Sequence, residues 1–469
     1  MSGLFSTLNS SVKALNAQSR AIEITGKNLA NVNNTSYARQ RVIFGDRGTV
    51  QTPQGAESSG LEALGIQQLR DALLDNQVVR EISISASDNS LQQGLQRAQA
   101  SLGENISSTA GASGSSSNSA GLGAAMDNFF NAFQSLAAQP TDAGQRQALL
   151  QNASILIDNF HQTDDRVAQV QNDLTTQIQS DVSNANGLLQ SIADLNNQIG
   201  RVEIGKPNSA VDLRDQRQAQ LEKLAAFLPI ETRTGTNGMI QVVMKDSSNA
   251  DVTLVNDATV MGPVAFTGSG FTGGTPATAL VFSTGSAAGE LAARDGSVLT
   301  LRNNINLLAG QIVAGVNKAY NPAATAGADF FDPTGTNAGT IALQSGLTPT
   351  NLQAGTGSAG DNSIALAVAA VPNKAFSTGS GDLINGTLNN FYSTTASNLG
   401  QSLATANTNV SEQTTIEKLV RSQRDGVSGV SLDEEMANLV TFQRAFQASS
   451  RVFSIVDNLL DTVVNHLGQ

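Results

Sequence analysis

Few residues in this 469-residue chain could perform chemistry, and the most suggestive group surrounds His161. Asp164 and Asp165 follow it by three and four positions, so a helix would bring one imidazole and two carboxylates to one face. Such a group could hold a divalent metal ion. No further histidine is nearby and the chain has no cysteine, so we interpret these residues as a solvated polar face. The other histidine, His466, lies near the end of the chain, where a cation at a helix C-terminus is favourable.

Two Gly-x-Gly-x-x-Gly patterns, at residues 268–273 and 355–360, could in principle bind a dinucleotide phosphate. That use needs a buried strand before the pattern, a helix after it and an acidic residue about twenty positions further on. The first pattern runs on through Gly/Thr-rich sequence to Pro276, and the second follows no convincing strand. With 43 glycines in the chain, composition accounts for both. No nucleophile elbow occurs and nothing marks a glycosidase-type carboxylate pair, so we expect no enzyme activity, no cofactor and no metal site.

Composition excludes several other classes of protein. The chain has 27 basic and 39 acidic residues, and no Lys/Arg run provides the positive surface that nucleic acid requires. Without cysteine it forms neither disulfides nor thiolate metal sites. No apolar run reaches the length of about 18 residues that marks a membrane span, and the first twenty residues lack a basic region and an apolar core typical of a secretory signal. We therefore expect no nucleic-acid partner and no membrane insertion.

The elements that position the remaining residues are mainly helices, and the clearest are at the two ends. Apolar residues recur there at alternating steps of three and four, which predicts narrow coiled-coil-like seams. An ordinary bundle core is one interpretation. Because chain ends usually fray, seams at both ends favour helices that pair and assemble with other copies. The seam residues predicted to form this assembly interface are Leu8, Val12, Leu15, Ile22, Leu29, Leu439, Phe442, Phe446, Phe453, Val456, Leu460 and Val463.

Capping signals define the inner limits of these end helices. Ser431 is a candidate N-cap, and Glu434 three residues later completes a capping box. The N-terminal helix is expected to stop at Asn31, Asn33 and Asn34, because asparagine favours turns.

The middle of the chain reads as a helical body with a β-rich insertion. Helices are predicted over 64–105 (as one or two), 126–138, 145–204, 211–227, 289–320 and 383–424, with a Gly/Ser-rich linker at 109–123. Short strands are predicted from residue 230 onward. The predicted fold is mainly α, with three domains: a coiled-coil-like inner domain from the terminal helices (1–45 and 426–469), a helix-rich rod domain (46–229 and 287–425, including a loop/β segment at 323–381) and a small outer β domain (230–286).

Two long motifs resemble the signatures of bacterial flagellar rod, hook and hook-associated proteins. The first is Asn28-Leu-Ala-Asn-Val-Asn-Asn-Thr-Ser-Tyr37, and the second extends from Val430 to Val464. Three shorter motifs are similar to the hook–filament junction members of this axial family: Tyr37-Ala-Arg-Gln40, Asp212-Leu-Arg-Asp-Gln-Arg217 and Gly289-Glu-Leu-Ala-Ala-Arg-Asp295. The resemblance covers most of the chain, except 252–285 and parts of 323–381.

The resemblance implies a structural subunit of the flagellum that forms a ring between hook and filament and is needed for filament assembly. It also implies export through the flagellar type III system to the extracellular flagellum. The expected partners are further copies of the chain, the hook protein, a second junction protein and an export chaperone on the C-terminal helix. Asn28, Leu29, Asn31 and Tyr37 of the first motif join the predicted assembly interface.

Two alternatives remain at this point. A hook or rod subunit of the same family is one, although such subunits have β-rich middles and lack a helix like that at 145–204. A surface enzyme built on an axial scaffold is the other, and it would require an added domain with clustered carboxylates, which the sequence does not display.

Overall fold

A computed structural model describes residues 2–46, 48–52, 55–58, 60–103, 121–357 and 360–465. Most of the predicted linker at 109–123 lies outside these residues, as does His466. The chain forms two compact units: unit 1 comprises Met1–Ser85, Val182–Gly285 and Gln413–Gln469, and unit 2 comprises Ala86–Asp181 and Ser286–Glu412.

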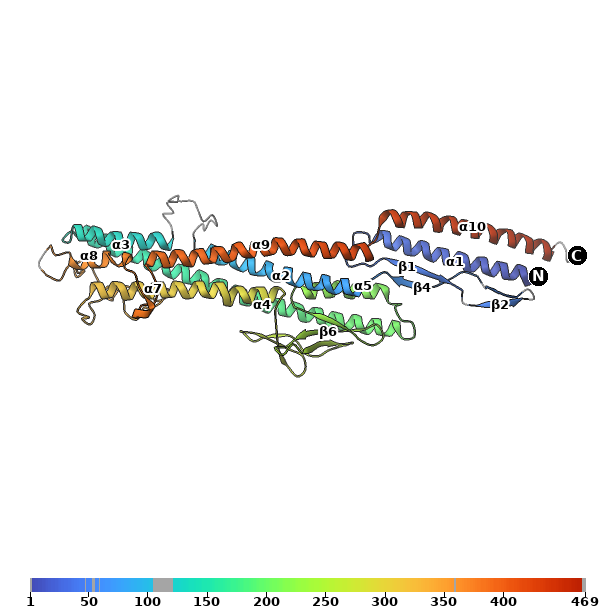
Figure 1. Cartoon of the computed structure of the whole chain (residues 1–469), viewed down its shortest axis with the longest axis horizontal. Coiled ribbons are helices and arrows are strands. Elements are labelled where there is room, and N and C mark those ends of the chain that lie inside the picture. The colour runs from blue at the N-terminus through green and yellow to red at the C-terminus, as the bar shows by residue number, and fades with distance from the viewer. Residues whose placement is uncertain are drawn as a thin grey trace. The chain divides into compact units, whose positions relative to one another are not determined.

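The predicted fold class, mainly α with a β-rich insertion, is confirmed (Figure 1). The helices are α1 (Ser2–Ala30), α2 (Ala72–Ser101), α3 (Leu122–Ala138), α4 (Ala143–Glu203), α5 (Val211–Ala225), α6 (Ser286–Ala292), a π-helix (Ala293–Val298), α7 (Leu299–Tyr320), α8 (Ser363–Ala369), α9 (Leu388–Ser428) and α10 (Leu432–Asn465), with short 3₁₀ turns at Val371–Asn373 and Thr378–Ser380. Helices α2, α4 and α9 contribute residues to both units.

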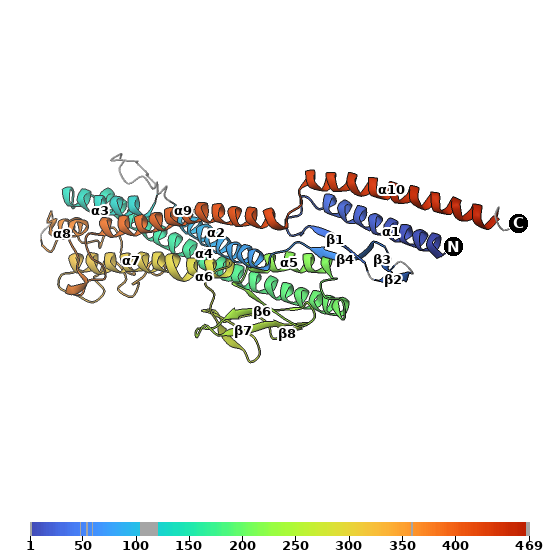
Figure 2. The same cartoon turned by 45° about the vertical axis from the view of Figure 1, so that its right-hand side comes forward.

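In unit 1 the two end helices lie side by side. Helix α1 packs along α10, and its other side lies against the hairpin of β1 (Gln40–Gly45) and β4 (Glu62–Gln68), as Figures 1 and 2 show. A second hairpin, β2 (Thr49–Thr52) with β3 (Gly55–Ser58), is formed by the residues between these strands. Helix α1 is thus held between a helix and a two-stranded sheet.

The hairpins correct one prediction. Residues 64–68 were expected to begin a helix, but they belong to β4, and α2 starts only at Ala72. Strand β4 is antiparallel to β1, with Ile66 opposite Val42, so a partner more than twenty positions away decides its conformation. The strand's backbone pairs there instead of with its own neighbours along the chain.

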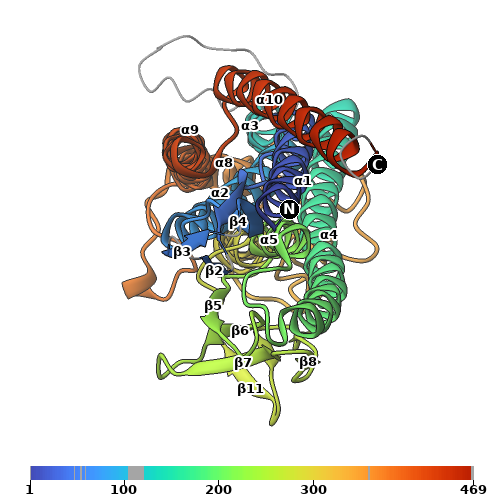
Figure 3. The same cartoon turned by 90° about the vertical axis from the view of Figure 1, so that its right-hand side faces the viewer.

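The β-rich insertion forms two small sheets in unit 1. One has the order β5 (Glu231–Thr234), β6 (Ile240–Lys245), β7 (Asp251–Asn256) and β8 (Thr259–Val260), all antiparallel. The other joins β9 (Ala265–Phe266), β10 (Phe271–Gly273) and β11 (Thr278–Leu280). Figure 3 shows the larger sheet beside the last turns of α4, where Asn196 donates to the Ile240 carbonyl at 2.8 Å.

Unit 2 has the larger apolar core. Helices α3, α4, α7 and α8 bury a continuous cluster in which phenylalanine rings pack edge to face. Phe129 lies 5.3 Å from Phe133, and Phe330 lies 5.0 Å from Phe331, measured between ring centroids. Such pairs add roughly 0.5–1.5 kcal/mol beyond the burial of area.

Candidate functional site

The paired end helices expose an apolar surface that their own chain does not cover. Helix α10 turns Val456 and Leu460 toward the interior, and both are less than a tenth exposed. Another set of apolar side chains on the same helix is about half exposed: Leu432, Met436, Val440, Val452, Ile455 and Leu459. We call these six residues the outer face of α10; Met436 and Val440 lie on one flank of the helix, and Val452, Ile455 and Leu459 lie on the other. Apolar side chains on several sides of a helix provide more apolar surface than one partner helix can bury.

The predicted interface residues are distributed over different environments. Val456, Leu460 and Asn28 are buried within the chain, and Val12 and Phe446 are exposed. The others are half-buried: Leu8, Leu15, Ile22, Leu29, Asn31, Tyr37, Leu439, Phe442, Phe453 and Val463. Phe442 contacts Phe44 of β1, with ring centroids 6.2 Å apart, so part of the C-terminal seam packs against its own chain.

Asn28 forms a buried hydrogen-bond junction at the end of α1. Its amide nitrogen donates to the Gln40 carbonyl at 2.8 Å and to the Glu435 carboxylate at 2.9 Å. Its amide oxygen accepts from the Tyr37 hydroxyl at 2.8 Å and from the Gln40 N–H at 3.0 Å. The side chain is 1% exposed, and all four of its hydrogen-bonding positions are used. Asn28 therefore joins α1, the turn that follows it and α10.

Arg39 fixes the beginning of α10 from the same turn. Its Nε donates to Glu435 at 2.7 Å and its Nη1 to Glu434 at 2.6 Å, while its backbone N–H donates to the Ser428 carbonyl at 2.8 Å. The predicted capping box is therefore incomplete. Ser431 Oγ accepts from the Glu434 N–H only at 3.5 Å, and the Glu434 carboxylate binds Arg39.

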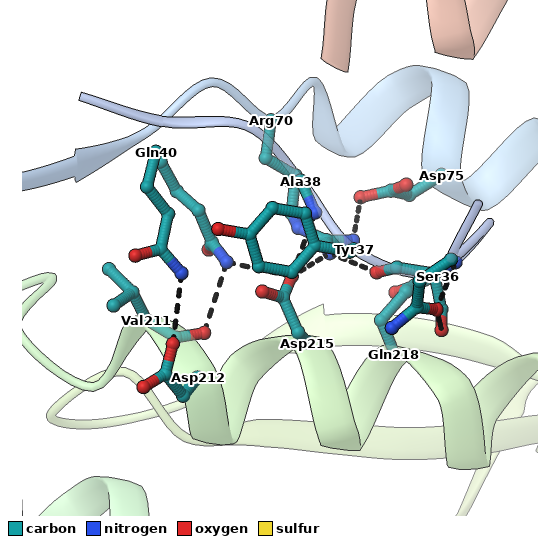
Figure 4. Close-up of polar contacts among 12 residues, drawn as sticks. Ser36, Tyr37, Ala38, Gln40, Arg70, Asp75, Val211, Asp212, Asp215 and Gln218 are labelled. Atoms are coloured by element: carbon teal, nitrogen blue, oxygen red, sulfur yellow. Dashed lines mark hydrogen bonds and ion pairs between the residues drawn. The ribbon is translucent and has the colours of Figure 1, made fainter. Parts of the chain in front are cut away.

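The turn after α1, residues 31–40, rests on α5, and we call it the signature turn (Figure 4). Asp215 Oδ1 accepts from Arg70 at 2.6 Å, from Gln68 at 2.7 Å and from the Ala38 N–H at 3.2 Å. Gln40 donates to Asp212 one turn earlier, at 2.9 Å. A carboxylate on α5 thus holds the backbone of the signature turn directly.

Burial and charge set the protonation of this cluster. Burial raises the pKa of the Asp215 carboxyl to about 6, and the Arg70 guanidinium opposes that rise. Burial, with the carboxylates of Asp215, Asp212 and Glu435, raises the pKa of the Tyr37 hydroxyl. Tyr37 therefore stays protonated and donates its proton toward Asn28.

The histidine and glycine patterns are used in ordinary structural ways. His161 Nε2 lies 2.9 Å from the Ile341 carbonyl, and Asp164 pairs with Arg302 at 2.8 Å. The pattern at 268–273 lies between β9 and the end of β10, and the next element after it is strand β11 instead of a helix. In the part of the chain that the structure describes, no group of three or more His, Cys, Asp or Glu side chains could hold a metal ion. Among the described helices, none is both long and apolar enough to span a membrane.

Sequence reasoning missed the charged residues of this junction. Nothing in the sequence linked Glu435 to Asn28, and Arg70 and Asp215 were not expected to meet across 145 positions. Only 14% of the residues are charged, so the grouping of charge near these motifs was the one signal that could have identified them.

Comparisons with known proteins agree along the chain. Residues 113–331 match the family described as flagellar hook-associated protein FlgK helical domain. Residues 422–466 match flagellar basal body rod FlgEFG protein C-terminal, and residues 8–37 match flagella basal body rod protein.

Individual relatives extend over nearly the full length. The chain is 25% identical over 524 residues to flagellar hook-associated protein 1 of Bacillus subtilis, covering 100% of this chain and 99% of that protein. It is 23% identical over 566 residues to flagellar hook-associated protein 1 of Salmonella typhimurium, covering 98% and 99%. The flagellar hook junction protein FlgK from Burkholderia pseudomallei aligns with a TM-score of 0.46 and 19% identity over 55% of this chain and 46% of that one.

Proposed function

We propose that this chain belongs to the flagellar hook-associated protein 1 family and is a structural subunit at the junction between hook and filament of the bacterial flagellum. The observation that carries this proposal is the alignment with hook-associated protein 1 from two distant bacteria across 98% or more of the chain. The match of residues 113–331 to the FlgK helical domain favours a junction subunit over a hook or rod subunit.

The surface proposed for assembly with further copies consists of the two predicted seams together with the outer face of α10. The half-exposed apolar side chains of that face support this role, because complete burial of such a side chain contributes roughly 1.5–3 kcal/mol and about half of that remains to be gained on assembly. A ring repeats this contribution at every contact between subunits.

The remaining partners follow from the position at the junction. One end of a ring would contact the hook protein and the other a second junction protein. The exposed apolar residues of α10 would also need cover before assembly, which an export chaperone would provide. The subunit would leave the cell through the flagellar export system and act outside it, as a structural component and not as an enzyme.

We propose the same three domains that the sequence predicts. Residues 1–45 with 426–469 would form the axial domain, 46–229 with 287–425 the rod domain and 230–286 the outer domain. The packing of α1 on α10 supports the first of these.

Deletion of the gene tests the function directly. We expect cells with hooks but no filaments, with filament subunits lost to the medium, and restoration when the gene is supplied in trans. Normal filaments on a clean deletion strain would exclude a necessary role at the junction.

A further inference from the structure

Helix α5 carries two sets of charged side chains on different faces. Asp212, Asp215 and Glu222 are three and seven positions apart, which places them on one side of a helix. Arg214 and Arg217 lie between them in sequence and point to another side, as their partners show. The junction-type motif at residues 212–217 supplies four of these five residues.

On the first face, two arginines hold two successive carbonyls of the signature turn. Arg70 Nη2 donates to the Ser36 carbonyl at 3.0 Å and to Asp215 at 2.6 Å. Arg424 of α9 donates from Nη2 to the Thr35 carbonyl at 2.6 Å and from Nη1 to Glu222 at 2.7 Å. Each guanidinium bridges a turn carbonyl and an α5 carboxylate. Arg424 uses two nitrogens of its guanidinium for this bridge, whereas Arg70 uses Nη2 alone and donates from Nη1 to Asp75 at 2.8 Å.

On the second face, α5 holds the larger sheet of the insertion. Arg217 Nη1 donates to the Gly238 carbonyl at 2.9 Å and to Asn196 Oδ1 at 2.8 Å. Arg214 makes a two-pronged bond to Glu203 at 2.8 and 2.7 Å. Burial lowers the pKa of Arg217 to about 10, so the guanidinium remains charged near neutral pH.

The β5–β6 turn fits closely against this second face. Gly238 has a φ of 74°, and a Cβ added to it would lie 2.7 Å from Arg214 Nη2 of α5 and 2.1 Å from Glu203 Oε2, at the end of α4, to which Arg214 is bonded. The turn can approach α5 this closely only because residue 238 has no side chain.

We infer that α5 is the positioning element of unit 1, with Asp215 fixing the signature turn and Arg217 fixing the β-rich insertion. Asn28 and Arg39 connect the signature turn to both end helices. Asp215 and Arg217 therefore set how the insertion is oriented relative to the α1–α10 pair. This role goes beyond assembly at the junction and can be measured on the folded chain alone.

The absence of cysteine makes the measurement simple, because two introduced cysteines are the only sites that a spin label would modify. Ser248→Cys in the insertion and Gln447→Cys on α10 are both at exposed positions. Pulsed electron paramagnetic resonance on the full-length chain then gives the distribution of distances between the two spin labels. We expect a narrow distribution that broadens with Asp215→Asn and, separately, with Arg217→Met.

Matched controls separate positioning from general loss of structure. Asp194→Asn and Arg201→Met remove the same charges from exposed positions of α4 in the same unit and should leave the distribution unchanged. Hydrogen exchange adds a local readout. Asp215→Asn should accelerate exchange of the Ala38 amide about tenfold without affecting β6. Arg217→Met should accelerate exchange of the amides at residues 238–240 without affecting Ala38. A broad distribution in the unsubstituted chain, or no broadening in either variant while circular dichroism shows a folded protein, would overturn the inference.

Discussion

Glu290 permits a quantitative test of how unit 2 is stabilised. It lies in α6, is 5% exposed, and its Oε2 has no hydrogen-bond partner among the described residues. Asp181 of α4, another buried carboxylate, acts on it electrostatically while accepting hydrogen bonds from Gln177 and Ser286. Burial first, and the charge of Asp181 second, raise the pKa of Glu290 to about 8, against the opposing effect of Arg97.

The sign of the pH dependence follows from which state holds the proton. The pKa of an unperturbed glutamate is 4.5, so between that value and about 8 the folded chain keeps a proton that the unfolded chain releases. The free energy of unfolding therefore falls as pH rises through this window, by up to about 1.4 kcal/mol per pH unit. The whole interval corresponds to about 5 kcal/mol, a large part of the stability of a domain.

Glutamine reproduces the protonated form at every pH, so Glu290→Gln should remove this dependence. We expect the variant to match the native chain near pH 5 and to exceed its free energy of unfolding by about 3–5 kcal/mol above pH 9. Urea unfolding followed by circular dichroism at several pH values measures the difference, and other titrating groups cancel because both proteins contain them. Glu412→Gln, at an exposed position of α9, is the matched control. A difference between variant and native chain that does not change with pH would refute the reasoning.

Three further outcomes are expected. Asn28→Ala removes four hydrogen bonds and leaves Glu435 without one of its buried donors. It should lower the free energy of unfolding by about 2–4 kcal/mol and accelerate amide exchange at the start of α10. Unchanged exchange there would contradict the proposed junction. Ile455→Asp changes a side chain that is 60% exposed, so the free chain should keep its melting temperature and be exported. Immunolabelling should nevertheless find the variant missing from hook tips, and the control Arg444→Asp should have a milder effect. Wild-type levels of Ile455→Asp at the tip would show that the outer face of α10 is not an assembly surface. Gly238→Ala should cost about 1–3 kcal/mol in thermal unfolding, because its φ of 74° is unfavourable for alanine, and an unchanged melting temperature would mean that the turn can move away from α5.

Local periodicity made much of the fold predictable. A helix over 145–204 was expected, and α4 spans Ala143–Glu203, because a long apolar repeat at helical spacing without proline favours one continuous helix. The hairpin of β1 and β4 was not predicted, since its strands depend on each other across a chain reversal. Local pattern cannot reveal a partner that lies elsewhere in the sequence.

The sequence identified residues of the candidate site, but it did not show whether their side chains face the interior or the surface. The motif that begins at Asn28 indicated an important surface, yet Asn28 itself is buried and bonds its own chain. A motif identifies residues under constraint without saying whether the constraint is internal or at an interface. The Arg70–Asp215 contact has no local pattern at all, because it joins segments 145 positions apart.

The bond between Asn28 and Glu435 joins residues 407 positions apart, and this separation has a consequence for the order of folding. Closing a flexible loop of that size costs about 5 kcal/mol of chain entropy, before any contact is gained. The cost falls once the intervening residues have folded, so the two ends should dock last, and slowly. A chain shortened before residue 435 could not close this bond. In truncated subunits α1 would thus lack its helical partner. Only a chain that includes residue 435 could pair its two ends and become able to assemble.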